Sequence, residues 1–317
     1  MALDVDRREQ VFGFGQNCIF GSVFEPGLRV SRALVDRGIP NVRAPIPAHG
    51  GVLGAPVTGS EDWTVVLYPF VEGRSAKVVG LDAAQWRIFG AALGAVNGSD
   101  LGAVFRDELR VEDFALPVGA VVRRLLTELE SATFASPAAA SFAGYWHGDT
   151  DHIQAVLART EALGRELQDR HFDVVLYHGD IHLINLIVDN IGGVWLVDWD
   201  GPLIAPRERD LLFVVGPRIG RRPTPREEDH FFEGYGATDI DPVALAYYRY
   251  ERRLEDLGEI GSRVFHDPRL SEAMRGQEAA AAIKSFAPDG DFAVAALVSR
   301  NRWPIETRDK STKEPPR

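Results

Sequence analysis

Three polar side chains stand where apolar runs end, and their types are those that phosphoryl transfer requires. The segment LYHGDIHLINLIVDN places Asp180 after an apolar run and Asn185 five residues later, and Asp198 follows the next apolar run. A carboxylate can orient an attacking hydroxyl and accept its proton. Carboxylate and amide oxygens suit Mg²⁺, a hard cation that bridges phosphates. We therefore assign Asp180 as the catalytic base, and Asn185 and Asp198 as the metal ligands.

The elements around these residues are predicted to bring them together. FDVVLY is typical of a strand that runs into a loop, and NLIVDNIGGVWLVDWD is typical of two strands joined by a turn at 190–193. Protein kinases carry the same order of His-x-Asp, Asn, hairpin and Asp. On that comparison, Leu186 and Ile187 lie under the adenine of ATP. The backbone of Tyr68, Pro69 and Phe70 then forms the hinge that binds the adenine edge.

The chain holds a second His-Gly-Asp tripeptide, which serves as an internal control. It spans 147–149 in YWHGDTDHIQ, but Gln154 stands where the first copy has asparagine. No apolar strand precedes the second copy and no hairpin pattern follows it. We interpret it as a loop that leads into a helix, and we assign it no chemistry.

Composition limits the class of protein. Of the 317 residues, 45% are hydrophobic and 26% are charged, which is typical of a soluble globular enzyme. No apolar run reaches the length of a membrane span, no signal pattern opens the chain, and the single Cys18 predicts a reducing, cytoplasmic location. The net charge of −11, with a short basic block at 218–223, argues against nucleic acid and suits a cationic small molecule. Oligomeric state stays open.

The remaining pattern predicts an α+β chain. Strands and turns dominate up to the hinge, with a hairpin at 51–73 that turns near Gly59, and helices dominate after Gly73. Capping residues and apolar stripes predict helices at 27–38, 82–98, 151–170, 241–258 and 270–286.

Several longer segments resemble one family. HGDIHLIN and LVDWD resemble the aminoglycoside phosphotransferase and choline kinase group, and VDWDGPLIAPRERDLLFV (197–214) looks like its spectinomycin phosphotransferase branch. The resemblance covers roughly residues 25–298. It implies a bilobal protein-kinase-like fold with a shortened β-rich N-terminal lobe over 1–72. A mainly helical C-terminal lobe over 73–300 and a disordered tail over 301–317 complete the predicted organisation.

The resemblance also implies roles and ligands. ATP is the expected phosphate donor with Mg²⁺, and the acceptor is a hydroxyl on a small molecule, with aminoglycoside or aminocyclitol antibiotics first. By position, Asp180 matches the family's base, Asn185 and Asp198 match its Mg²⁺ ligands, and Asp210 matches a buried acid that braces the loop.

One expected residue is missing. Phosphotransferases of this kind use a lysine on an early strand, but the four lysines of this chain begin at Lys77, after the hinge. The segment GFGQNCIFG also lacks the G-x-G-x-x-G spacing. Glu25 is a candidate for the acid that normally pairs with that lysine. We therefore keep two alternatives: a catalytically impaired kinase-like protein that acts by binding, and a kinase for choline or another amino alcohol.

Five further residues have two interpretations each. His178 is either a general base or a structural residue that bonds the loop, and we favour the structural role. Asp200, Glu227, Glu251 and Asp256 are candidates for binding a cationic acceptor. A turn at Asp200, the helix dipole at the acidic first turn that holds Glu227, and i,i+4 ion pairing at Glu251 and Asp256 explain the same positions without a ligand.

Overall fold

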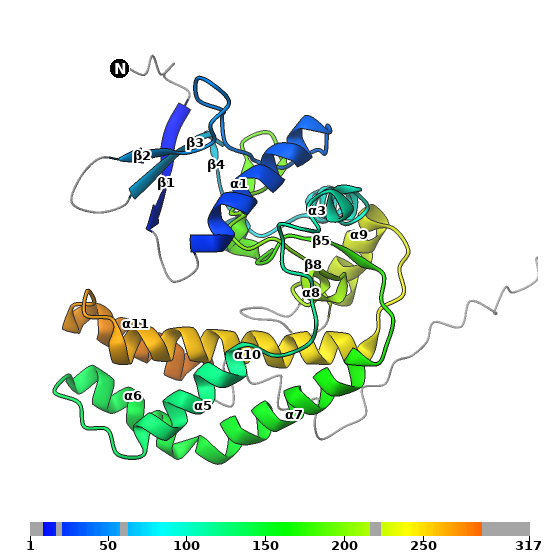
Figure 1. Cartoon of the computed structure of the whole chain (residues 1–317). Helices are drawn as coiled ribbons and strands as arrows, with labels where there is room; N and C mark the ends of the chain where they lie inside the picture. Colours follow the sequence, from blue (N-terminus) through cyan, green and yellow to red (C-terminus); the bar gives the residue numbers. More distant parts are fainter. Residues whose placement is uncertain (1–8, 17–20, 58–62, 216–222, 287–317) are drawn as a thin grey trace, which may run out of the picture. The chain divides into compact units, whose positions relative to one another are not determined.

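The computed structural model describes residues 9–16, 21–57, 63–215 and 223–286 (Figure 1). The chain forms two compact units. The first comprises Met1–Leu116 and Glu161–Tyr248, and the second comprises Pro117–Thr160 and Arg249–Arg317. Helices combine with small antiparallel sheets, which confirms the predicted α+β class. The lobe boundary predicted at residue 72 stays a prediction, and the predicted disordered tail lies outside the described residues.

The first unit begins with a three-stranded sheet in the order β1-β3-β2. Its strands are β1 (Glu9–Gln16), β2 (Ala55–Val57) and the central β3 (Trp63–Pro69). β2 and β3 are antiparallel, with Ala55 opposite Val65, which confirms the predicted hairpin. The turn predicted near Gly59 lies outside the described residues.

Helix α1 corrects one predicted boundary. We expected a helix at 27–38, whereas α1 spans Gly21–Asp36 and contains Pro26. Proline favours the first turn of a helix and lacks the N–H of an interior residue, so the sequence pattern pointed to a start just after it. The helix instead continues N-terminally from Pro26, and its buried face includes Leu28, Val30 and Leu34.

Two further sheets frame the candidate site. β5 (Val174–Tyr177) pairs with β8 (Leu203–Pro206), and β4 (Gly73–Ser75), β6 (Leu186–Asp189) and β7 (Val194–Leu196) form a sheet in the order β4-β6-β7. The Asp189 N–H donates to the Gly193 carbonyl at 2.9 Å, which confirms the predicted hairpin and its turn. The short elements nearby are α2 (Ala76–Val79), η1 (Leu183–Asn185), α4 (Leu101–Val104) and α8 (Glu208–Leu211).

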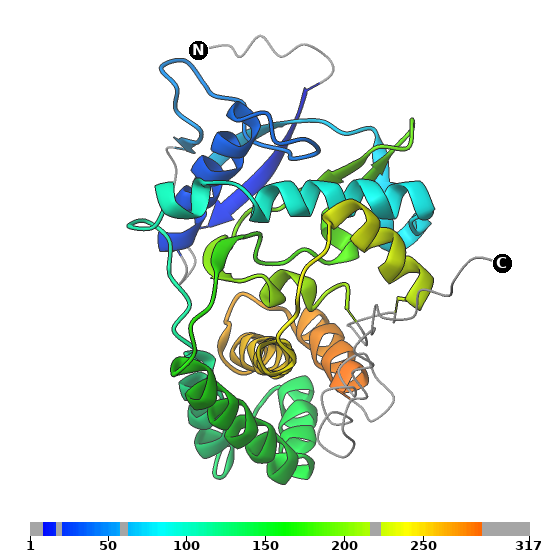
Figure 2. The same ribbon diagram turned by 90° about the vertical axis from the view of Figure 1, so that its right-hand side faces the viewer.

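Helices α3 (Ala83–Asn97) and α9 (Pro225–Tyr235) lie side by side in the first unit (Figure 2). The Asp82 side chain accepts from the Gln85 N–H at 2.8 Å, so a capping residue starts the helix predicted at 82–98. The backbones of the two helices almost touch. A Cβ added to Gly90 would lie 2.0 Å from the Phe231 carbonyl oxygen. Glycine is therefore required where α3 crosses α9.

The second unit is helical. It contains α5 (Val118–Leu129), α6 (Pro137–Gly148) and α11 (Glu272–Phe286), and it shares α7 (Thr150–Gln168) and α10 (Pro242–His266) with the first unit. The helices predicted at 151–170 and 270–286 are confirmed within two residues at each end. Every helix in the described part of the chain is too short or too polar to cross a lipid bilayer.

Helix α10 corrects the second predicted boundary. We expected Gly258 to end this helix, but α10 continues to His266. A Cβ at Gly258 would meet a Val118 methyl at 3.0 Å, and one at Gly261 would meet a Leu125 methyl at 2.8 Å. These glycines therefore serve close helix packing, a role that a local stop signal in the sequence cannot distinguish from termination.

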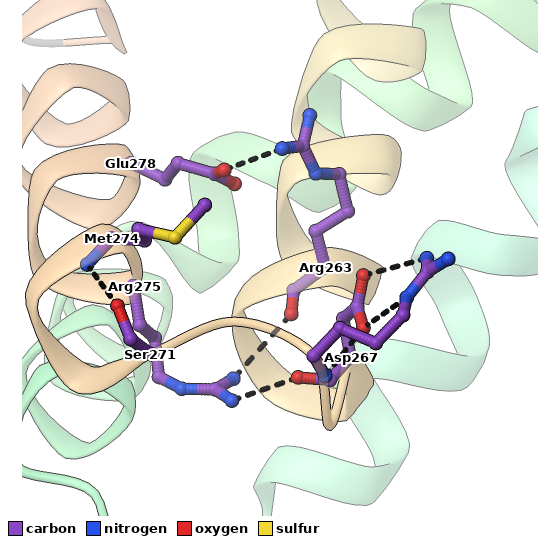
Figure 3. A network of polar contacts seen from close by, with 7 residues as sticks. Arg263, Asp267, Ser271, Met274, Arg275 and Glu278 are labelled. Carbon is purple, nitrogen blue, oxygen red and sulfur yellow. Dashed lines mark hydrogen bonds and ion pairs between the residues drawn. The ribbon is translucent and has the colours of Figure 1, made fainter. Parts of the chain in front are cut away.

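Polar contacts fix the turn between α10 and α11 (Figure 3). Arg275 of α11 donates to backbone carbonyl oxygens at the end of α10, including that of Asp267 at 2.8 Å. Arg263 of α10 forms an ion pair with Glu278 of α11. Cationic donors satisfy the carbonyls that a helix C-terminus leaves without intrahelical partners. The junction is therefore set by side chains from both helices.

Because α3 and α9 cross so closely, adding one methyl group at Gly90 should destabilise the fold. Gly90→Ala should lower the free energy of unfolding by about 2 kcal/mol or more, since the methyl meets backbone atoms that cannot rotate away. Gly144→Ala is the matched control, because a Cβ there meets nothing within 4 Å and Gly144 lies inside α6. The control should gain up to about 1 kcal/mol from helix propensity. Denaturant titration followed by tryptophan fluorescence measures both, and equal effects would contradict this packing.

Candidate active site

The loop from His178 to Asn185 (the HGD loop) is held by a buried carboxylate. Asp210, on α8, is fully buried, and its Oδ2 accepts from the His178 N–H at 3.1 Å. The Gly179 N–H also donates to Asp210. Gly179 has a φ of +111°, and a Cβ there would lie 2.4 Å from the Gly201 carbonyl oxygen. Two successive N–H groups and one obligatory glycine therefore define the path of the chain into Asp180.

The imidazole of His178 links the HGD loop to the segment that carries Asp198. Its Nε2 lies 3.1 Å from the Val197 carbonyl oxygen, so Nε2 carries the proton, and Nδ1 accepts from the Asp180 N–H at 3.3 Å. The ring packs on Trp199 with a centroid distance of 4.3 Å. Burial lowers the pKa of His178 to about 4. A neutral ring with both nitrogens bonded to backbone suits a structural role better than that of a general base.

Asp180 is fixed from its C-terminal side as well. Its carbonyl oxygen accepts from the Asn185 side-chain amide at 2.9 Å and from the His182 N–H at 2.9 Å. Its carboxylate Oδ2 lies 3.2 Å from His182 Nε2. Because the Asn185 nitrogen faces Asp180, the Asn185 amide oxygen is the atom that can face a cation. The loop thus presents one carboxylate and one amide oxygen from a rigid turn.

The Asp198 segment joins the loop through backbone contacts. The Val197 N–H donates to the Asn185 carbonyl oxygen at 3.1 Å. Asp198 follows β7 and has a φ of +69°, in the left-handed region that non-glycine residues rarely adopt. Backbone strain of this kind concentrates at functional sites, where surrounding contacts must hold it. The predicted base and both predicted metal ligands therefore belong to one connected set of backbone hydrogen bonds.

Acidic side chains gather around Asp198. Desolvation, then the carboxylates of Asp200 and Asp180, raise the pKa of Asp198 to about 6. Asp198 itself is exposed to solvent, beside these two carboxylates. The pKa of Asp200 is raised by desolvation, although its hydrogen bond with Asp198 opposes that shift. Such a concentration of negative charge is the environment that a divalent cation stabilises.

The donor types fit Mg²⁺. Asp198 offers a carboxylate and Asn185 an amide oxygen, and Mg²⁺ is commonly held by one or two carboxylates, waters and substrate phosphates. Within the described ranges, no three His, Cys, Asp or Glu side chains form a ready-made metal cage. A metal that shares its coordination with phosphates does not need such a cage.

Two residues that the sequence pattern did not predict, Asn97 and Tyr235, support the loop. Asn97, at the end of α3, donates to Asp210 Oδ2 at 3.2 Å and to the Leu176 carbonyl at 2.9 Å. The Tyr235 hydroxyl donates to the Asn97 amide oxygen at 2.8 Å. The sequence offers one sign of the role of Asn97, because this polar residue lies on the apolar stripe of α3, one turn after Leu93. Burial raises the pKa of Asp210 to about 6, and these contacts with backbone and amide donors oppose the shift.

Comparison with known proteins identifies the family. A family model described as phosphotransferase enzyme family matches residues 25–248, which include the HGD loop, Asp198 and Asp210. The chain belongs to this phosphotransferase family. The chain is 29% identical to protein StrN of Streptomyces griseus over 258 residues, covering 79% of this chain and 73% of StrN.

Solved structures show the fold of this phosphotransferase-family chain. A spectinomycin phosphotransferase in complex with ADP and spectinomycin matches with a TM-score of 0.78 and 24% identity, over 92% of this chain and 93% of that one. An AMP-bound complex of a spectinomycin phosphotransferase matches with a TM-score of 0.73 and 25% identity, over 92% and 87% of the two chains. The predicted protein-kinase-like fold and family are thereby confirmed.

The predicted hinge residues of this family member follow β3. Tyr68 and Pro69 end the strand, and Phe70 is exposed just beyond it. Desolvation, then the charges of Asp200 and Asp198, raise the pKa of the Tyr68 hydroxyl above its usual range. Ile187 lies on β6, opposite Ser75 of β4. The assignment of these residues to adenine stays a prediction.

The four acidic acceptor candidates fall in different places. Asp200 lies beside Asp198, and Glu227 accepts from the Thr224 N–H at 2.8 Å in the capping box of α9. Glu251 is buried, and Asp256 pairs with Arg252 at 3.1 Å along α10. Glu251 and Asp256 belong to the second unit, whereas Asp200 and Glu227 belong to the first. Capping and i,i+4 pairing are thus observed at Glu227 and Asp256.

The second His-Gly-Asp tripeptide lies where α6 ends and α7 begins. His147 lies in the last turn of α6, with Nε2 2.9 Å from the Leu129 carbonyl oxygen. Asp149 joins α6 to α7 and accepts from the Tyr145 hydroxyl at 3.1 Å. The predicted loop is wrong, because the first two residues of the tripeptide belong to α6, whereas the helix predicted to follow is present as α7.

The buried neutral His178 predicts a distinctive pH dependence. An unfolded histidine binds a proton below about pH 6.5, whereas folded His178 resists protonation down to about pH 4. His178 therefore removes stability as pH falls through this range, by up to about 3 kcal/mol. His178→Gln lacks this term, so the stability difference between the wild type and the variant should narrow from pH 7 to pH 4. Denaturant titrations at several pH values measure the difference, and a constant difference would show that the ring titrates normally.

Proposed function

We propose that this chain transfers the γ-phosphate of ATP to a hydroxyl group of a small cationic molecule. An aminoglycoside or aminocyclitol antibiotic is the acceptor class to test first. The observation that carries the proposal is the linked geometry of Asp180, Asn185 and Asp198. Asn185 contacts the Asp180 carbonyl through its side chain, and its own carbonyl accepts from the Val197 N–H beside Asp198.

Each residue of the set has a role that its chemistry allows. Asp180 orients the acceptor hydroxyl and accepts its proton, and His182 holds one oxygen of that carboxylate at 3.2 Å. The Asp198 carboxylate and the Asn185 amide oxygen hold Mg²⁺. When bound, Mg²⁺ offsets charge on the triphosphate. The acceptor oxygen forms the new bond to phosphorus as the bond to ADP breaks.

The nucleotide is proposed to lie between the hinge and β6. Backbone groups of Tyr68, Pro69 and Phe70 bind the adenine edge, and Ile187 lies beneath the ring. The ADP and AMP bound by the similar spectinomycin phosphotransferase structures support a nucleotide here.

A cationic acceptor fits the charge of the chain. The net charge is −11, and the Asp198 cluster adds a local concentration of carboxylates. Asp200 is the first candidate for an acceptor amine or hydroxyl, and Glu227, Glu251 and Asp256 are weaker candidates. The similar solved structure contains spectinomycin, which supports an aminocyclitol as the first compound to test.

The metal ligands should govern nucleotide binding. Calorimetric titration of MgATP into the full chain should give saturable binding, and Asp198→Ala should weaken that binding at least tenfold, because one of the two proposed protein ligands is lost. Titration of ATP with EDTA present is the control. Equal affinity for MgATP in both proteins would exclude Asp198 as a ligand.

The base assignment predicts a loss of turnover without a loss of binding. Asp180→Asn should lower kcat for transfer to spectinomycin by roughly a thousandfold, with MgATP affinity unchanged, because the amide cannot accept a proton. Asp149→Asn makes the same change in the second tripeptide and should keep wild-type turnover.

Turnover assays with different acceptors distinguish the antibiotic kinase from the two alternatives. Transfer to choline but not to aminocyclitols would identify an amino-alcohol kinase. MgATP binding without turnover on spectinomycin, aminoglycosides or choline would favour the impaired kinase-like protein.

A further inference from the structure

The peptide unit that joins Gly179 to Asp180 is held at both of its polar groups. The Gly179 carbonyl oxygen accepts from the Tyr177 hydroxyl at 2.6 Å. The Asp180 N–H donates to His178 Nδ1 at 3.3 Å. With both groups engaged, rotation of this peptide breaks two hydrogen bonds, one of them short. The direction in which the Asp180 side chain leaves the backbone therefore depends on Tyr177.

Tyr177 is itself immobilised. It ends β5, is 3% exposed, and forms the ladder pair with Leu203 of β8. The guanidinium of Arg209 lies 5.2 Å from the centroid of the Tyr177 ring and 5.3 Å from that of Tyr248. A cation within about 6 Å of an aromatic face is attracted to it, and more strongly where water is excluded. The Tyr177 ring is thus held by Arg209 as well as by the ladder with β8.

A buried acid fixes the arginine. Arg209 Nη1 donates to Glu112 Oε2 at 3.0 Å, and both side chains are buried. Glu112 Oε1 accepts the N–H groups of Asp113 at 3.1 Å and Phe114 at 2.8 Å. A buried ion pair holds its geometry only when such extra hydrogen bonds satisfy its charges. Successive contacts from Glu112 to Arg209 and from Arg209 to Tyr177 therefore support the hydrogen bond of Tyr177 to the Gly179 carbonyl oxygen.

We propose that Tyr177 is a positioning residue for Asp180. Its hydroxyl sets the orientation of the Gly179–Asp180 peptide, and the Arg209–Glu112 pair holds its ring in place. The consequence for turnover rests on the proposed function, whereas the hold on the loop does not. Arg209 is a poor probe, since removal of one partner of a buried pair destabilises the whole fold. Tyr177→Phe removes only the hydroxyl.

The experiment compares Tyr177→Phe with Tyr145→Phe in the full chain. The control loses the same chemical group, because the Tyr145 hydroxyl donates to Asp149 in the second unit. Hydrogen exchange of a peptide covering 178–185 reports on the loop without any need for turnover. Steady-state kinetics with MgATP and spectinomycin report on catalysis.

In Tyr177→Phe, we expect about tenfold faster exchange at the start of the loop and about tenfold lower kcat, with KM for MgATP within twofold of the wild type. Tyr145→Phe should change neither quantity. Unchanged exchange in Tyr177→Phe overturns the proposal, and so does unchanged kcat despite faster exchange. If the wild type transfers no phosphate, the proposed function fails and the catalytic consequence fails with it, while the exchange result alone decides whether Tyr177 holds the peptide.

Discussion

The structure of the HGD loop depends on a carboxylate buried where water cannot reach it. Burying a charge costs several kcal/mol unless hydrogen bonds replace its lost hydration. Asp210 meets that requirement with the N–H groups of His178 and Gly179 and the side-chain amide of Asn97. These donors come from separate parts of the chain, so they satisfy the carboxylate only when the loop and α3 take their observed places.

The same principle extends along α8, which has a buried charged residue at three successive positions. Glu208 accepts the Asp241 N–H at 2.8 Å, at the start of α10. Arg209 pairs with Glu112, and Asp210 binds the HGD loop. Each charge has a partner from a different segment of the first unit. The single turn of α8 thus connects the start of α10, the segment around Glu112 and the HGD loop. These contacts together hold the loop in place.

The carboxylates around Asp198, unlike the buried charges of α8, face one another and repel. Carboxylates of Asp180, Asp198 and Asp200 act on each other strongly enough to shift a pKa, and Asp198 also adopts a left-handed backbone conformation. Neither feature favours folding. Unfavourable local arrangements that the surrounding structure enforces are characteristic of functional sites. Two hydrogen bonds hold the Asp198 segment in this arrangement. The His178 ring donates to the Val197 carbonyl oxygen, and the Val197 N–H donates to the Asn185 carbonyl oxygen.

The sequence alone determined the features that local patterns encode. The spacing of Asp180 and Asn185, the hairpin before Asp198 and the cap of α3 all depend on residues close together in the chain, and the strand, hairpin and cap are present in the structure. Tertiary structure decided the rest. Asn97 supports the loop, and Gly258 lies inside a helix, because of neighbours more than 75 residues away in sequence. No local pattern distinguishes such a polar residue or glycine from an ordinary one, since its role is set by the segment that packs against it.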